Sequence, residues 1–316
     1  MREHGRERDH VHMPPVSREI FSFESTARFN LHERILLPAT ARFAPPPNVR
    51  GDWPGADLQQ ELTVAIDAYR RQLKSMLGEE NAAAQRQLTA GTDQTFCSDK
   101  HPTAVPREIC ALYQDYRAKQ WSADDASNKR WIADVRSVEA DKWPAIAKRL
   151  SAVYRAPWPD TVLTVQVTAQ VGGPGAAYTL SNPLITVSSS DRRHRGKRAI
   201  EILFHEASHL LTKELGDTLR AAAQQLGVSL PRGLWHASLF YLTGAVVKEH
   251  LGGDYVTYGE GRGLYERGGF KGWLPHLRAA WQPYLDGGVE MVTAAKRLVA
   301  SVSSSSTNDG KARTGS

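Results

Sequence analysis

The sequence predicts an α+β protein that is predominantly helical. Apolar residues recur at helical spacing through the N-terminal half, a β-branched segment follows in the middle of the chain, and helical patterns return after it. With 316 residues, of which 41% are hydrophobic, the chain is long enough for about two compact units with a buried core.

Four regions are expected along the chain. Residues 1–20 are polar and charged, and we predict that they are disordered. Residues 21–155 should be mainly helical, and residues 156–300 should form a small sheet with the helices that hold the chemically informative side chains. Residues 301–316 are rich in Ser, Gly and Lys, a composition typical of a disordered tail.

Helices in the N-terminal half are predicted from apolar positions three and four residues apart. The clearest run is Ala56–Leu77, and Ile109–Trp121 and Trp131–Tyr154 repeat its pattern. These segments show no catalytic motif, so we expect this half to serve as a scaffold.

Strands and further helices are predicted downstream. Thr161–Thr168 alternates apolar with polar residues, which indicates a half-buried strand, and Tyr178–Ser188 should form a second strand. Helical patterns follow over Lys197–Lys213, with Gly216 marking the end of the helix, and over Leu234–Leu251.

Composition excludes two classes of partner. The chain has 40 Lys and Arg against 34 Asp and Glu, a net charge of +6. Part of this excess lies in Asp191–Arg198, but no aromatic residues alternate with the basic ones and no nucleic-acid-binding motif is visible. No segment approaches the roughly 18 apolar residues of a transmembrane helix. We therefore expect neither a nucleic-acid partner nor a membrane span.

The N-terminal segment and the cysteines bear on location. The N-terminal segment lacks the apolar run of a secretory signal, which predicts a cytoplasmic protein. Export is the alternative if the natural N-terminus is longer. Cys97 and Cys110 are the two cysteines. They could pair in an oxidising compartment, but reduced thiols are the simpler expectation.

The most informative motif is His205-Glu-Ala-Ser-His209, within the helix predicted over 197–213. Two histidines four residues apart on a helix present both imidazoles on one face, close enough to bind one metal ion. The apolar residues of this helix lie roughly 140° to 260° around the axis from His205, so the other face can line a cleft. A chain of this composition contains about 0.02 such motifs by chance.

In this motif the sequence resembles the zincin metallopeptidases, either gluzincin-like members or an uncharacterised bacterial branch. The resemblance covers about residues 160–265 and implies a zincin-like small sheet with an active-site helix. It implies one Zn²⁺ ion per chain, with His205 and His209 as ligands and Glu206 as general base. It also implies that the strand Leu184–Ser189 forms an edge of the substrate cleft.

A catalytic zinc ion needs a third protein ligand, which the motif does not supply. His236 is our preferred candidate, because it lies near the start of the helix predicted over 234–251. Glu249, Glu260 and Asp254 remain alternatives.

A donor to the oxyanion would complete the expected active site. Tyr258 is the preferred candidate because it lies in a Gly-rich loop that could close over the cleft, and Tyr241 and Tyr265 are alternatives.

These residues predict a zinc-dependent metallohydrolase. We expect a peptidase that hydrolyses a peptide or another amide substrate, with Glu206 as general base. The alternative is a non-catalytic protein that is stabilised by zinc and uses the same cleft for binding. The presence of Glu206 argues against this alternative, because a purely structural zinc site does not need it.

Overall fold

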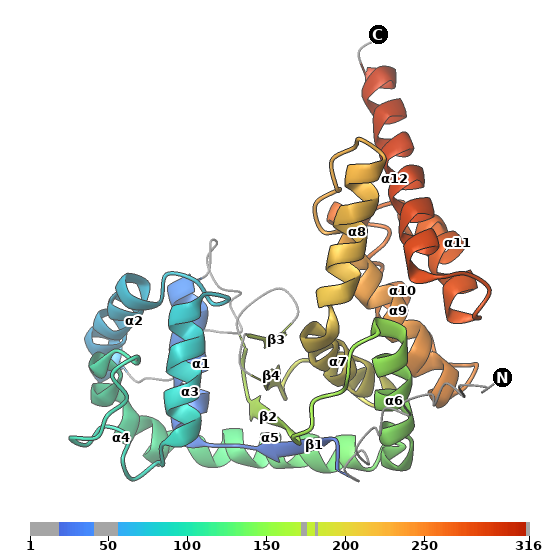
Figure 1. Ribbon diagram of the computed structural model, residues 1–316. Helices are drawn as coiled ribbons and strands as arrows, with labels where there is room; N and C mark the ends of the chain where they lie inside the picture. Colours follow the sequence, from blue (N-terminus) through green and yellow to red (C-terminus); the bar gives the residue numbers. More distant parts are fainter. Residues whose placement is uncertain (1–18, 41–55, 172–175, 181–182, 314–316) are drawn as a thin grey trace, which may run out of the picture.

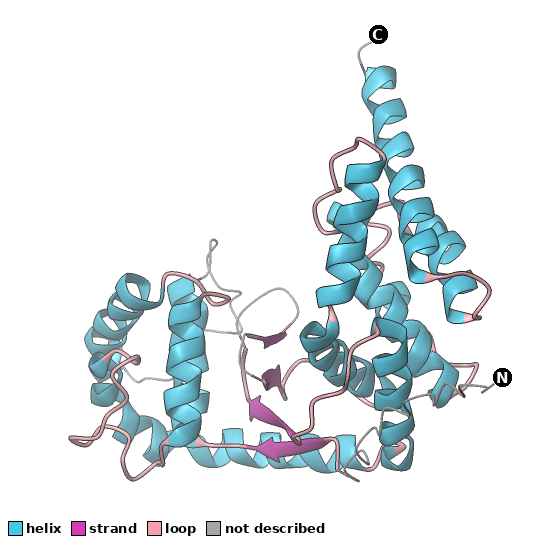
Figure 2. Ribbon diagram, in the orientation of Figure 1, coloured by secondary structure: helices cyan, strands magenta, loops and turns pink. Residues whose placement is uncertain are grey.

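The computed structural model describes residues 19–40, 56–171, 176–180 and 183–313. A small sheet lies at the centre, with one group of helices to its left and a second, larger group to its right (Figure 1). Helices make up most of the structure (Figure 2), so the prediction of a predominantly helical α+β protein is confirmed.

The sheet has four strands in the order β1-β2-β4-β3. The strands β1 (Phe21–Glu24), β2 (Leu163–Thr168) and β4 (Leu184–Ser188) are parallel, and β3 (Ala177–Thr179) runs antiparallel to β4 at one edge. The segment predicted as one strand over 178–188 is therefore two strands. The expectation that Leu184–Ser189 forms the cleft edge is wrong, because β4 lies between two other strands.

Both faces of the sheet are covered by helices. Side chains alternate along a strand, so neighbouring residues point to opposite faces. Val165 and Ile185 pack into the core formed with the C-terminal helices, while Leu184 packs into the core of the N-terminal helices. Gln166 and Thr168 are fully buried as well. The predicted half-buried strand is thus buried on both faces.

Four helices form the N-terminal group, and they share one hydrophobic core. Their amphipathic spacing explains the packing, because each buries one apolar face against the others. These helices are α1 (Ala27–Thr40), α2 (Gln59–Leu73), α3 (Glu79–Ala90) and α4 (Cys110–Lys119).

The remaining helices surround the other face of the sheet and extend away from it (Figure 1). Trp131 and Leu150 belong to the core of this second group, so the two cores do not divide the chain at the predicted boundary after residue 155. The helices are α5 (Trp121–Arg136), α6 (Trp143–Tyr154), α7 (Lys197–Ser208), α8 (Lys213–Gln225), α9 (Leu234–Leu251), α10 (Tyr258–Gly261), α11 (Leu274–Leu285) and α12 (Met291–Arg313).

The predicted end of the helix over 197–213 and the predicted disordered tail both need correction. Gly216 does not end a helix but lies within α8, which follows α7 after a short 3-10 turn over His209–Leu211. The tail predicted to be disordered is helical up to Arg313, because the buried apolar residues Leu298 and Val302 carry α12 past residue 301. Of the N-terminal segment predicted to be disordered, residues 1–18 lie outside the described residues, and Ile20 is buried.

Cys97 and Cys110 form a disulfide, so the expectation of reduced thiols is wrong. In the intervening loop, Nδ1 of His101 accepts a hydrogen bond of 3.3 Å from the Cys97 backbone N–H. The expected cytoplasmic location stays a prediction. Among the described residues, no helix is long and apolar enough to cross a bilayer.

Candidate metal centre

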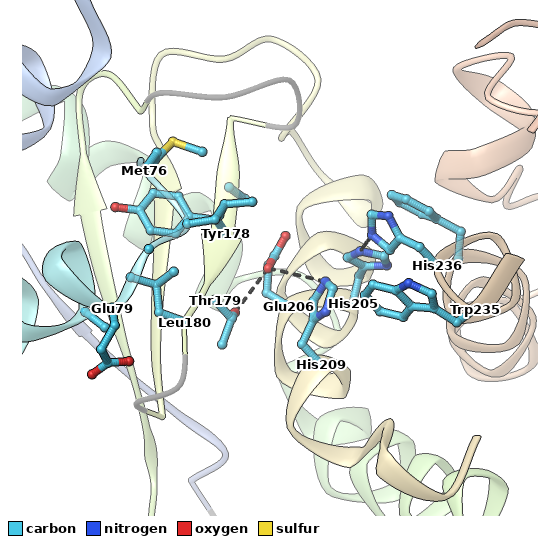
Figure 3. Close-up of a pocket in the computed structure, with 15 residues that line it drawn as sticks. Met76, Glu79, Tyr178, Thr179, Leu180, His205, Glu206, His209, Trp235 and His236 are labelled. Carbon is cyan, nitrogen blue, oxygen red and sulfur yellow. Dashed lines mark hydrogen bonds and ion pairs between the residues drawn. The ribbon is translucent and has the colours of Figure 1, made fainter. Parts of the chain in front are cut away.

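Helix α7 carries the histidine motif through the middle of the molecule. One side of α7 contacts β3 and β4, and another side contacts α9. Ile200, Leu203 and Phe204 anchor the helix in the core, as the predicted apolar face requires. His205, Glu206 and His209 point instead toward the space between α7, α9 and the edge strand (Figure 3).

Three histidines converge in this space. One ring nitrogen of each of His205, His209 and His236 lies within 4.8 Å of the corresponding atoms of the other two. The Nε2 atoms of His205 and His236 are 3.2 Å apart. Two imidazoles bound to one tetrahedral zinc ion at 2.0–2.1 Å would place their nitrogens about 3.3 Å apart. The separation of these two nitrogens is thus compatible with ligation of a single zinc ion.

Helix α9 delivers His236 because it packs closely against α7. The chain turns into α9 at Gly233, whose φ of 84° favours glycine, and His236 follows in the first turn of the helix. Further along α9, the ring of Phe240 stacks on His205 with centroids 3.9 Å apart. At Gly244, a Cβ atom would lie only 2.9 Å from Oε1 of Glu201 on α7. Glycine at this position permits the close approach of the two helices.

Burial keeps the three imidazoles neutral. It lowers the pKa of His236 to about 4. It also lowers the pKa of His209 to about 3, where repulsion from a protonated His236 would add to the effect. Burial likewise lowers the pKa of His205 well below its usual value. Metal ligation needs the neutral imidazole with its lone pair free. This donor set, three neutral and convergent nitrogens, fits Zn²⁺.

Glu206 lies next to the histidines, on the side of the edge strand. Its Oε2 atom is 4.0 Å from Nε2 of His209 and accepts a hydrogen bond of 3.1 Å from the Thr179 hydroxyl (Figure 3). The carboxyl is almost completely buried, and burial raises the pKa of Glu206 to about 8. A divalent cation at the histidines would oppose this shift, because it favours the carboxylate.

The edge strand is held in place by the N-terminal helices. Thr179 faces α7, so its neighbour Tyr178 points to the opposite face of the sheet. There the Tyr178 hydroxyl donates a hydrogen bond to Glu33 of α1. It accepts hydrogen bonds from Nε2 of Gln85 at 2.7 Å and Nδ2 of Asn81 at 3.3 Å, both on α3. The half of the chain expected to be only a scaffold thus positions the partner of Glu206.

A cavity of about 470 Å³ opens onto this centre. Its lining comes from four segments: residues 76–82 at and before the start of α3, residues 177–180 of the edge strand and its continuation, α7 and α9. Thr179 and the segment 76–82 were missed by the sequence reasoning, and no local pattern marks them. Trp235 was also missed, although it is the sequence neighbour of the candidate ligand His236. In the structure its ring stacks on that imidazole, with the centroids 5.0 Å apart.

Tyr258 does not line the cavity, so the expectation that it donates to the oxyanion needs correction. Its ring stacks behind Phe240 at 6.1 Å, and its backbone N–H donates to Glu201 at 2.7 Å. The Gly-rich loop therefore folds against α7 and α9 and does not close over the cleft. Tyr241 and Tyr265 do not line the cavity either.

The alternative third ligands are engaged elsewhere. Glu249 forms an ion pair with Arg149 at 3.4 Å, and Glu260 forms one with Arg278 at 2.7 Å. Asp254 lies in an exposed turn after α9.

Comparison of this chain with protein-family models, with curated proteins and with solved structures gave no match.

Proposed function

We propose that this protein is a zinc-dependent metallohydrolase of the zincin type, and that it acts as a peptidase on amide bonds. The observation that carries the proposal is the convergence of His205, His209 and His236 beside a buried Glu206, at a cavity large enough for a substrate. One Zn²⁺ ion per chain is the expected complement.

His205, His209 and His236 would hold the zinc ion. When bound, zinc supplies Lewis-acid activation of a water molecule and of the substrate carbonyl. Glu206 accepts the proton of the attacking water and passes it to the leaving nitrogen as the amide bond breaks. The Thr179 hydroxyl holds Oε2 of this carboxylate and so fixes its orientation during both proton transfers.

The arrangement of the three histidines and Glu206 fits the alternative, a non-catalytic zinc-stabilised binding protein, less well than it fits a hydrolase. Structural zinc sites usually have four protein ligands, whereas three histidine nitrogens converge here among the described residues. Burying the Glu206 carboxyl also opposes folding, and a structural site gains nothing from it.

Metal analysis combined with one substitution tests the proposal. The zinc-reconstituted protein should contain about one zinc ion per chain by mass spectrometry and should hydrolyse peptides. Glu206→Gln should keep the zinc and lose about 10²- to 10⁴-fold in kcat, the contribution typical of a general base. Glu214→Gln, at an exposed position on α8, is the matched control and should change neither quantity. A protein that binds no zinc, or a Glu206→Gln variant with unchanged hydrolysis, would refute the proposal.

A further inference from the structure

The cavity has two chemically different sides. The three histidines and Trp235 occupy one side, and Met76, Tyr178 and Leu180 lie across Glu206 from them (Figure 3). The lining also includes Leu77, Ala82 and Ala177, which come from the same two chain segments as Met76 and Leu180. We call Met76, Leu77, Ala82, Ala177 and Leu180 the apolar wall.

Charged and hydroxylated groups find few partners along this wall. No Lys or Arg is among the described residues that line the cavity, so an acidic group would have no counter-charge. The one carboxylate on this side, Glu79, forms an ion pair with Arg86 at an exposed position. The Tyr178 hydroxyl is directed away from the cavity and into the buried network with Glu33. A saccharide or acidic group bound here would lose hydrogen bonds to water without replacement.

The wall also offers space and exposed apolar surface. Two of its residues, Ala82 and Ala177, have short side chains. Leu77 is 63% exposed, and Trp235 on the opposite side of the cavity is 38% exposed. Exposed large apolar side chains on both sides of a cavity are typical of a surface that becomes covered by a ligand.

We propose that the apolar wall is a subsite for a bulky apolar side chain, aliphatic or aromatic, next to the scissile amide of a peptide substrate. This inference rests on the proposed peptidase function and names the substrate class of that same site. The wall comes from the α2–α3 connection, the first turn of α3, and the edge strand with its continuation. The N-terminal region would therefore help to set the specificity of a centre whose expected ligands lie in α7, the turn that follows it, and α9.

The test is to compare cleavage preferences after a cation is introduced into the wall. Zinc-loaded protein is incubated with a proteome-derived peptide library, and the cleavage sites are read by mass spectrometry. Leu or Phe should be enriched at one position beside the cleaved bond. In peptides matched at all other positions, exchange of that residue for Ala should lower kcat/KM at least about tenfold.

Met76→Arg should shift the preference toward Asp or Glu, with the ratio of kcat/KM for acidic over apolar peptides rising at least about tenfold. Leu77→Arg, at a position already largely exposed, tests the same wall if Met76→Arg does not fold. Val64→Arg is the matched control, because Val64 is 47% exposed on α2 and does not line the cavity. Zinc content should be unchanged in all three variants.

Each failure has its own signature. Peptide cleavage that depends on Glu206 but shows no apolar preference, or a preference that neither arginine variant shifts, overturns the inference and leaves the proposed function standing. If the zinc-loaded wild type cleaves no peptide in the library, the proposed function is overturned, and the inference fails with it.

Discussion

Substitution of Gly244 by Ala should destabilise the protein, although the same change usually stabilises a helix. In an unconstrained helix interior, Ala is favoured over Gly by about 0.8–1 kcal/mol. At Gly244 the added Cβ would lie 2.9 Å from Oε1 of Glu201 and 3.1 Å from Cβ of Thr257.

Neither neighbour can withdraw freely. Glu201 is buried, and its Oε2 accepts hydrogen bonds from the Tyr255 hydroxyl at 2.6 Å and the Tyr258 backbone N–H at 2.7 Å. Overpacking costs about 1–3 kcal/mol. Weakening one hydrogen bond to a buried carboxylate costs about 1.5 kcal/mol more. After subtraction of the helix propensity gain, we expect a net loss of about 2–3 kcal/mol.

Urea denaturation followed by far-UV circular dichroism measures this loss. Gly216→Ala is the control: Gly216 also lies in a helix, but the nearest atom to its added Cβ is the flexible end of Arg220, at 3.4 Å. Gly216→Ala should gain about 0.8–1 kcal/mol. Because α9 carries His236, Gly244→Ala should also weaken zinc binding, whereas Gly216→Ala should not. A Gly244→Ala protein that is as stable as the wild type would refute the argument that close helix packing builds the centre.

Three further predictions follow from the site and its supports. His236→Ala should lower the zinc affinity by more than about 100-fold, measured by competition with a chromogenic chelator, and an unchanged affinity would remove His236 from the ligand set. Tyr178→Phe should lower the free energy of unfolding by about 1–3 kcal/mol, because three buried polar partners lose their hydrogen bond to the hydroxyl. The variant should also hydrolyse peptides more slowly while it keeps its zinc. If the variant is as stable as the wild type, Tyr178 does not anchor the edge strand. His32 is fully buried, and burial lowers its pKa to about 4. The unfolded chain binds this proton below about pH 6.5 and the folded chain only near pH 4, so stability is lost as the pH falls through this window, by up to about 3 kcal/mol. Unfolding titrations across this range should show a smaller slope in His32→Gln, and an identical slope in the two proteins would count against the prediction.

The metal centre could be predicted where it depends on local spacing. His205, Glu206 and His209 lie within one and a half helical turns, so helix geometry alone places them together. His236 could be predicted as a third candidate ligand because the helix that carries it was predicted with the same bounds as α9, Leu234–Leu251. Metal binding, the identity of the metal and the peptidase activity all stay predictions.

What depends on non-local packing could not be predicted in this way. β3 has only three residues, too few for a periodic signal, and its position at the sheet edge is fixed by pairing with β4 and by contacts to α1 and α3. Thr179 therefore had no recognisable pattern. Tyr258 was misplaced because its Gly-rich loop is drawn against α7 by the buried carboxylate of Glu201, a contact that loop composition does not reveal.

The pairing of β1 with β2 has a consequence for how the chain folds. Phe21 lies opposite Leu163 in the sheet, so two neighbouring strands come from segments separated by the whole N-terminal helical group. Such a pairing closes a very long loop, which makes this step slow compared with the formation of the helices. A polypeptide that began after residue 155 would leave the backbone groups along one side of β2 without their partner and prone to intermolecular association. During synthesis, β1 must therefore remain available until β2 has emerged, and the molecule is expected to mature as one cooperative unit.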